Sequence, residues 1–216
     1  NYEVIVRNFI DGQYGDCVGS VSIENYATNT GKLLYQFAAG DCSEVEQAVA
    51  CAKRAYKEGV WSHLSIGERQ AVISKLADLV EENAETFALY ESLDVGKPIM
   101  NALHDDVART VGGLRACVND IDKLLGSCGN DAGSLVYQSR SPIGVVAGIA
   151  VWNYPLTLAA GKIGPALITG NSIILKPAEF TSLSAGLFAE LATEAGVPAG
   201  VVNVVHGGAS VGDAIA

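Results

Sequence analysis

Short apolar segments alternate with helical ones over residues 143–216, the last third of the chain. The apolar segments are residues 145–150, 172–175 and 201–205, and a stretch with helical spacing follows each of them. Continuous apolar strands of this length, separated by helices, are typical of a parallel sheet covered by helices on both faces. The sequence therefore predicts an α/β fold of Rossmann-like type, in which ligands bind beyond the carboxyl ends of the strands.

The N-terminal residues have a different pattern. Residues 4–14, 21–23 and 33–37 alternate loosely between apolar and polar side chains, and Asp-Gly and Thr-Gly pairs interrupt them. Alternation around such turn residues predicts short antiparallel strands in an N-terminal hairpin region. The three predicted parallel strands would keep an unpaired edge, so we expect the chain to be marginally stable or to associate.

The middle of the chain is predicted to be helical. Ser43 with Glu46, and Ser65 with Glu68, have the spacing of capping boxes, and each opens a segment with helical periodicity. Two further helices are expected over residues 85–93 and 101–125.

Residues 126–133 are small and polar, which predicts a loop. Residues 135–140 then alternate like an exposed strand. Because the edges of this strand would be unpaired within one compact domain, we expect it to reach another part of the protein or another subunit.

Composition excludes several classes of partner. The net charge is −10, and no cluster of Lys and Arg breaks the acidic trend, so nucleic acid is not an expected partner. The apolar run at 143–151 is too short to span a bilayer, and the N-terminal residues lack a secretory pattern. The five cysteines form no CxxC motif and lie far from the histidines, so we expect free, structural thiols in the cytoplasm.

Asn153 follows the first predicted parallel strand, two residues before Pro155. An amide at this edge can donate a hydrogen bond to an oxygen that becomes negative when a carbonyl is attacked. Alternatively, Asn153 caps the helix that Pro155 begins, and position alone leaves both interpretations open.

Lys176 and Glu179 follow the second strand, where a lysine and a carboxylate suit the two hydroxyls of a ribose. A solvated ion pair on a loop is the alternative. A carboxylate at the ribose would repel a 2′-phosphate, which favours NAD over NADP.

Gly208 and Gly212 follow the third strand and would let the backbone approach a pyrophosphate, although they match neither GxGxxG nor a Walker loop. Lys162, in an apolar helix, either extends to solvent or is held by a carboxylate as part of a proton path.

Six segments in order resemble the NAD(P)-dependent aldehyde dehydrogenase superfamily. They are NYATNTGK at 25–32, ESLDVGKP at 91–98, WNYP at 152–155, GN at 170–171, KPAE at 176–179 and GVPAGVVNVV at 196–205. The resemblance runs from the N-terminal hairpins to Ala216.

The resemblance implies roles for particular residues. Asn153 would donate to the oxyanion of a thiohemiacetal, and Lys162 would take part in a charge relay. The resemblance also implies a cofactor site and a monovalent-cation site. The cofactor site would comprise Ile149, Val151, Trp152, Asn153, Lys176, Pro177, Ala178, Glu179, Gly208 and Gly212, and the cation site Glu24, Asp94 and Phe180.

Two positions depart from the family pattern. Val151 stands where many members have proline, and Gly161 stands where several have an aromatic residue that lines the substrate tunnel. The sequence GVVAGI…WNYP is most similar to that of the betaine and amino-aldehyde branch. A missing aromatic side chain would weaken a cage for a quaternary ammonium group.

The resemblance also implies a domain division. Residues 1–124 and 142–216 would form an incomplete NAD-binding domain, residues 125–141 part of an oligomerisation hairpin, and the catalytic domain, with its cysteine nucleophile and general base, would lie outside this chain. The parent protein is expected to be a homo-oligomer, a dimer or tetramer, that oxidises an aldehyde to a carboxylic acid with NAD. Residues 1–216 alone are expected to be inactive. The alternative is a non-catalytic nucleotide-binding or structural relative.

Overall fold

A five-stranded mixed sheet forms the centre of the computed structural model, which describes residues 5–124 and 126–216. Its order is β2-β1-β9-β8-β7. The three parallel strands are β7 (Val145–Ile149), β8 (Ser172–Lys176) and β9 (Val202–Val204). All five residues of β8 are buried, because helices cover both faces of this central strand. The Rossmann-like prediction is therefore confirmed.

The N-terminal hairpin completes this sheet. β1 (Asn8–Ile10) pairs with β2 (Gln13–Gly15) and, antiparallel, with β9, where Phe9 lies opposite Val204. Of the three parallel strands, β9 is thus paired on both sides, and the predicted unpaired edge is that of β7, the last strand of the sheet. The side chain of Asn8 reinforces the join, because its Oδ1 accepts a hydrogen bond of 2.7 Å from the backbone N–H of His206.

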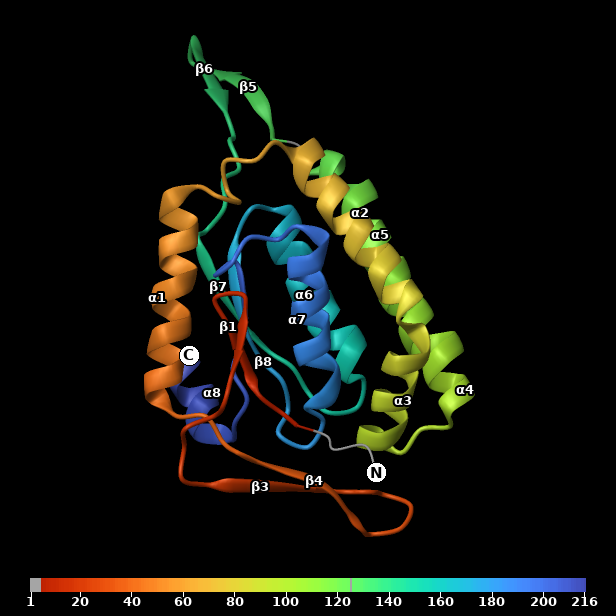
Figure 1. The fold of residues 1–216 in the computed structure, drawn as a ribbon. Coiled ribbons are helices and arrows are strands. Elements are labelled where there is room, and N and C mark those ends of the chain that lie inside the picture. The colour runs from red at the N-terminus through yellow and green to blue at the C-terminus, as the bar shows by residue number, and fades with distance from the viewer. Residues whose placement is uncertain (1–4, 125) are drawn as a thin grey trace.

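The helices are arranged in layers around the sheet (Figure 1). α1 (Cys42–Glu58) and α8 (Ala209–Ile215) cover one face. The other face is covered by α6 (Pro155–Ile168) and α7 (Leu183–Ala195), and α2 (Ile66–Glu82) and α5 (Ala108–Asp120) pack outside these two. The main core lies between this double layer and the sheet, and includes Phe188, Ile163 and Leu175.

Caps define the ends of the first helices. The box at Ser65 and Glu68 is confirmed, but the box at Ser43 and Glu46 was wrong. The N-cap of α1 is Asp41, whose side chain accepts from the Ser43 N–H at 2.8 Å, while Glu44 accepts from the Asp41 N–H at 2.8 Å. Since an Asp two residues upstream supplies the same acceptor, the helix begins earlier than the Ser-Glu spacing indicated.

Residues 84–123 are helical with one irregularity. α3 (Ala84–Val95) ends at Gly96, which adopts a left-handed conformation. α4 (Ile99–Asn101), a π-helical segment η1 (Ala102–Val107), α5 and a 3-10 turn η2 (Ile121–Lys123) follow. The predicted single helix over 101–125 is thus interrupted at its start by a π-helical turn, and Leu125 lies outside the described residues.

Two hairpins lie apart from the main sheet (Figure 1). β3 (Ser22–Tyr26) pairs with β4 (Leu33–Ala38), and β5 (Cys128–Asp131) pairs with β6 (Ser134–Tyr137). The prediction of a loop over 126–133 was wrong for residues 128–131, which form β5, the partner strand of β6. Every residue of β5 and β6 is exposed, and the hairpin projects from the body of the molecule.

Candidate functional site

The carboxyl ends of the parallel strands lie side by side. The register places Ile149 of β7 opposite Lys176 of β8, and the next N–H, that of Ala150, donates to the Lys176 carbonyl at 2.9 Å. On the other side of β8, the Val205 N–H donates to the Leu175 carbonyl at 2.9 Å. The segments that follow these strands therefore meet at one edge of the sheet.

Lys176 is almost completely buried at this edge. Its side chain is 5% exposed, and its Nζ donates to the Pro177 carbonyl at 3.0 Å and lies 3.4 Å from a carboxylate oxygen of Glu179. The side chain of Glu179 is 32% exposed, and it is the open half of the pair. The alternative of a solvated ion pair does not describe this geometry, because the lysine is held inside. Gly212 of α8 lies beside the Lys176 alkyl chain: a Cβ there would be 3.7 Å from Cδ.

Apolar side chains are exposed next to this buried pair. Ile149, Val151 and Trp152 are 48%, 54% and 59% exposed, whereas Pro177 and Ala178 are buried. The edge thus combines a fixed charge with an open apolar surface. Binding sites for flat organic ligands commonly combine these features.

The Asn153 side chain is exposed and makes no hydrogen bond to another described residue. The N-cap of α6 is Tyr154, and neither Tyr154 nor Asn153 makes a capping hydrogen bond with its side chain. The interpretation of Asn153 as a helix cap is therefore not what the structure shows. Its amide is available to a ligand at the sheet edge.

His206 lies between the end of β9 and the glycines that precede α8. It is 1% exposed, and burial, with the nearby charge of Lys176, lowers its pKa to about 3, so the imidazole is neutral. Its Nδ1 has no partner among the described residues. Gly208 beyond it is open, since an added Cβ would meet nothing within 4 Å.

Lys162 is half-buried on α6. Its alkyl chain packs on Gly148 of β7, where a Cβ would be 3.2 Å from the Lys162 Cδ. Among the described residues it forms no ion pair. The alkyl chain of Lys162 therefore lies along the sheet, and its role stays a prediction.

The three expected cation ligands lie in segments that converge. Asp94, at the end of α3, accepts from the Tyr35 hydroxyl at 2.6 Å and from the Leu183 N–H at 3.0 Å. Asn25, next to Glu24 in β3, donates to the Glu179 carbonyl at 3.1 Å, and Phe180 follows. Burial raises the pKa of Asp94 to about 7. Among the described residues, no three His, Cys, Asp or Glu side chains gather as a metal site.

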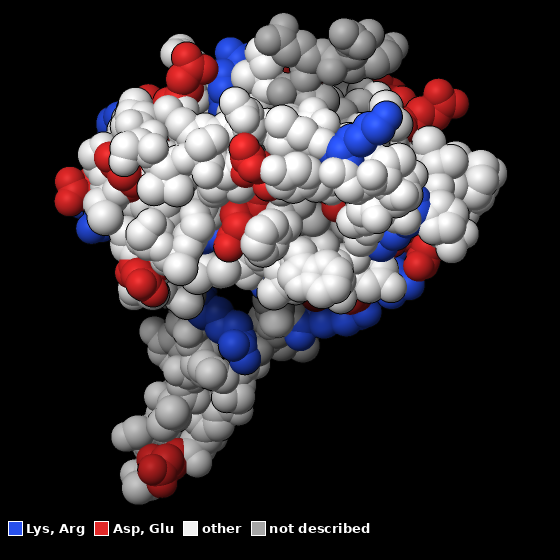
Figure 2. All heavy atoms as spheres, turned by 90° about the horizontal axis from the view of Figure 1, so that it is seen from below, with Lys and Arg blue, Asp and Glu red and all other residues white. Residues whose placement is uncertain are grey.

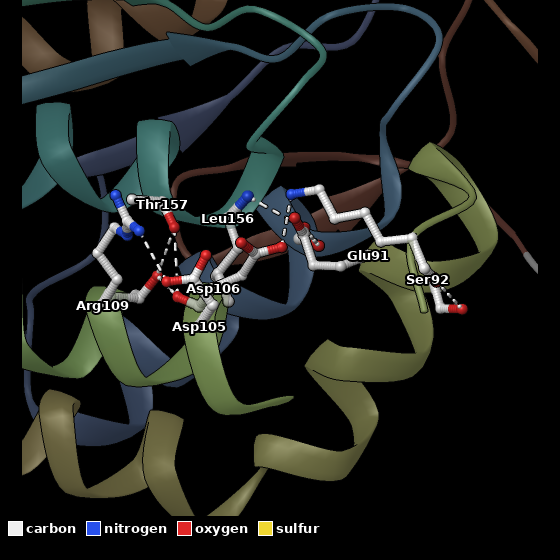
Figure 3. A network of polar contacts seen from close by, with 10 residues as sticks. Glu91, Ser92, Asp105, Asp106, Arg109, Leu156 and Thr157 are labelled. Carbon is white, nitrogen blue, oxygen red and sulfur yellow. Dashed lines mark hydrogen bonds and ion pairs between the residues drawn. The ribbon is translucent and has the colours of Figure 1, made fainter. Parts of the chain in front are cut away.

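A buried polar network was missed at the sequence level (Figure 3). Glu91 of α3 is fully buried, and burial raises its pKa to about 7. Lys97 forms a 2.6 Å ion pair with Asp106 of η1. A signal was available, because Phe87, Glu91 and Asp94 share the buried face of α3, where charged residues are rare without a partner.

Two of the five cysteines lie where burial disfavours the thiolate form. Burial raises the pKa of Cys17 to about 11 and raises that of Cys117. Cys51 is buried in α1, and Cys42 and Cys128 are exposed thiols. The expectation of free cysteines is met among the described residues.

Charge is mixed on the face that includes β3 and β4 (Figure 2). Acidic and basic side chains are scattered over this face, and wide uncharged areas separate them. Among the described residues, no helix combines the length and the apolar character that crossing a membrane requires.

Residues 18–216 match the model of the aldehyde dehydrogenase family. The chain is 45% identical over 203 residues to aminoacetaldehyde dehydrogenase of Pseudomonas aeruginosa, covering 94% of this chain and 41% of the relative. It is 42% identical over 202 residues to the NADP/NAD-dependent aldehyde dehydrogenase PuuC of Escherichia coli K12, covering 93% and 41%.

Solved structures agree with these relatives. The P. syringae indole-3-acetaldehyde dehydrogenase AldA, in a complex with NAD+ and IAA, superposes with a TM-score of 0.93 at 40% identity, covering 100% of this chain and 44% of that one. The chain thus spans about two fifths of the length of the curated relatives that it matches. The family match covers nearly all of these 216 residues, and the chain belongs to the aldehyde dehydrogenase family.

Proposed function

We propose that this chain is the NAD-binding part of an aldehyde dehydrogenase that oxidises an aldehyde to a carboxylic acid. One observation carries the proposal: an exposed Asn153 amide without an internal partner lies at the same sheet edge as the Lys176–Glu179 pair. Family membership supports it, as do relatives whose names state aldehyde oxidation.

The residues at this edge fit a dinucleotide. The ammonium of Lys176 and the partly exposed carboxylate of Glu179 would bind ribose hydroxyls, and Gly208 and Gly212 would admit the pyrophosphate. Ile149, Val151 and Trp152 would contact the flat parts of the ligand, and the backbone of Pro177 and Ala178 would line its path. Bound NAD would supply the acceptor for the hydride that leaves the aldehyde carbon. NADP is less favoured, because the Glu179 carboxylate would repel a 2′-phosphate.

Asn153 acts on the carbonyl oxygen in this proposal. When a cysteine thiolate adds to the aldehyde carbon, the C=O π electrons move to oxygen, and the Asn153 N–H donates to that oxyanion. Lys162 is proposed as part of the charge relay. The attacking thiolate and the general base are proposed to lie in the part of the enzyme beyond this segment, since the chain covers only 41% of the curated relatives and burial raises the pKa of both Cys17 and Cys117.

Purified residues 1–216 are therefore expected to give no aldehyde oxidation. NADH formation, followed by its absorbance during incubation with NAD and an aldehyde, measures this directly. Steady turnover would contradict the proposed location of the nucleophile. The nucleophile would then have to be sought among the five cysteines of this segment.

Replacing Glu179 with alanine is expected to weaken NAD binding by about 10- to 100-fold, because one hydrogen bond to a charged group is worth about 1.5–3 kcal/mol. NADP binding should weaken less, since the variant also removes a repulsive charge. Calorimetry on the full-length protein measures both affinities. Glu194→Ala, which removes an exposed carboxylate from α7, is the matched control. Unchanged NAD affinity in Glu179→Ala would exclude Glu179 from the ribose site.

Amino-aldehydes are the proposed substrate class, because the relative with 45% identity is an aminoacetaldehyde dehydrogenase. The structure shows open space beside Gly161 of α6, where an added Cβ would meet nothing within 4 Å. This space supports the inference that the substrate passage is wide on this side.

Gly161→Tyr is accordingly expected to narrow the passage. In the full-length enzyme, kcat/KM should fall about tenfold for indole-3-acetaldehyde and less for aminoacetaldehyde, because steric exclusion grows with substrate size. Gly112→Tyr is the control, since Gly112 is also exposed, helical and open. Equal losses for the two aldehydes would contradict this placement of Gly161.

The hairpin at 125–141 is proposed to join subunits of a homo-oligomer, a dimer or tetramer. Leu135, Val136 and Tyr137 support this, being 68%, 55% and 72% exposed on a two-stranded ribbon. A domain division at 1–124, 125–141 and 142–216 is proposed together with this role of the hairpin. Residues 1–4 and 125 lie outside the described residues.

A cytoplasmic location is proposed from the free cysteines. A monovalent cation is proposed near Asp94, with the carbonyls of Glu24 and Phe180.

A further inference from the structure

The first turn of α6, which directly follows Asn153, is held by residues of another part of the chain. α1 and α2 have capping boxes, whereas the N-cap residue of α6, Tyr154, makes no capping hydrogen bond with its own side chain. The first N–H groups of a helix have no intrahelical partner and need acceptors. At α6, Glu91 accepts one of these N–H groups, that of Leu156, while Lys97 and Asp106 contact the side chains of Tyr154 and Thr157.

Glu91 provides the first contact. Its Oε1 accepts from the backbone N–H of Leu156 at 3.1 Å and from the hydroxyl of Ser184 at 2.6 Å. Its other oxygen has no partner among the described residues. A fully buried carboxyl therefore joins the start of α6 to α7 through one oxygen atom.

Lys97 and Asp106 provide the second and third contacts. The Lys97 Nζ lies 3.8 Å from the centroid of the Tyr154 ring and donates to Asp106 at 2.6 Å. The backbone carbonyl of Asp106, in η1, accepts from the hydroxyl of Thr157 at 3.2 Å. Figure 3 shows Glu91 and Asp106 directed toward the turn that carries Leu156 and Thr157.

We propose that Glu91 is a positioning residue for Asn153: by accepting the Leu156 N–H, it fixes the turn from which the Asn153 amide projects. Only two residues, Tyr154 and Pro155, lie between Asn153 and Leu156, so a tilt of this turn moves the amide relative to the strand ends. The inference rests on the proposed function, because a positioned amide matters only if Asn153 binds an oxyanion. Misplacement of a catalytic group by about 1 Å can cost roughly 10²-fold in rate.

Two variants of the full-length enzyme test this role. Glu91→Leu removes the acceptor and is expected to lower kcat about tenfold. The NAD dissociation constant should stay within about twofold of wild type, because the hydrogen bonds of Glu91 are to Leu156 and Ser184 and not to the proposed ribose ligands Lys176 and Glu179. Glu91→Gln keeps an acceptor oxygen and should retain kcat within about threefold. Glu85→Leu, the same change at an exposed position of α3, is the control and should not alter kcat.

A double-mutant cycle separates positioning from general destabilisation. If Glu91 acts through Asn153, Glu91→Leu should cost little further activity in an Asn153→Ala background. Additive losses in kcat would overturn the inference. So would a Glu91→Gln variant as impaired as Glu91→Leu.

A different result would contradict the proposed function itself: Asn153→Ala alone would then keep wild-type kcat. If Glu91→Leu does not fold, Thr157→Val tests the same turn through the Asp106 contact, with the same cycle and the same criteria. Amide hydrogen exchange of the 153–160 peptide should be faster in either variant than in wild type, and unchanged exchange would overturn the inference.

Discussion

Replacing Asn153 with alanine in the full-length protein is expected to lower kcat by about 10²- to 10³-fold, the cost of removing one oxyanion donor. The NAD dissociation constant should change by less than about twofold, because the proposed ribose contacts are made by Lys176 and Glu179 and not by Asn153. Steady-state kinetics with an aldehyde and NAD, together with calorimetry, measure the two effects separately.

Stability should not confound this result. Asn153 is exposed and makes no hydrogen bond to another described residue, so its replacement should change the free energy of unfolding by less than about 0.5 kcal/mol. Asn101→Ala, at another exposed asparagine, is the control for the substitution itself. A kcat within about threefold of wild type would show that Asn153 does not stabilise the developing charge.

Replacing Phe188 with alanine is expected to lower the free energy of unfolding by about 3–5 kcal/mol. Phe188 is 0% exposed in α7 and belongs to the core between the sheet and the double helical layer. The loss combines the transfer of the ring to water with the cavity that remains. Because a domain has about 5–15 kcal/mol of stability in total, the urea midpoint of residues 1–216 should fall sharply.

Phe180→Ala is the matched control, because Phe180 is 61% exposed a few residues before α7. This change should alter the free energy of unfolding by less than about 0.5 kcal/mol. Equal shifts of the urea midpoint in the two variants would contradict the assignment of the core to the α7 face.

Local patterns predicted the parallel strands well. The three apolar segments coincide with β7, β8 and β9 to within one residue at each end, because buried parallel strands carry their signal in composition. The hairpin strand β5 was missed for the opposite reason: its residues are small, polar and entirely exposed, so nothing in their hydrophobicity marks a strand. The pairing of β1 with β9 joins distant segments, and no local pattern specifies such a pairing.

The site divides in the same way. Asn153, Lys176 and Glu179 could be placed because each follows a recognisable strand. Their surroundings could not: the burial of Lys176 depends on α8 packing beside it, and the hold of Glu91 on α6 depends on three helices meeting. Interactions between elements decide these features, and sequence periodicity reports only on elements one at a time.

The pairing of β1 with β9 also has a consequence for the order of folding. Asn8 and His206 are 198 positions apart, so during synthesis the N-terminal hairpin emerges long before its neighbour in the sheet. At about 5–20 residues per second, that interval is roughly 10–40 s. Throughout this interval, the edge of β1 that later pairs with β9 is a free template for intermolecular pairing. A chaperone that shields this edge would have the most effect during the same interval.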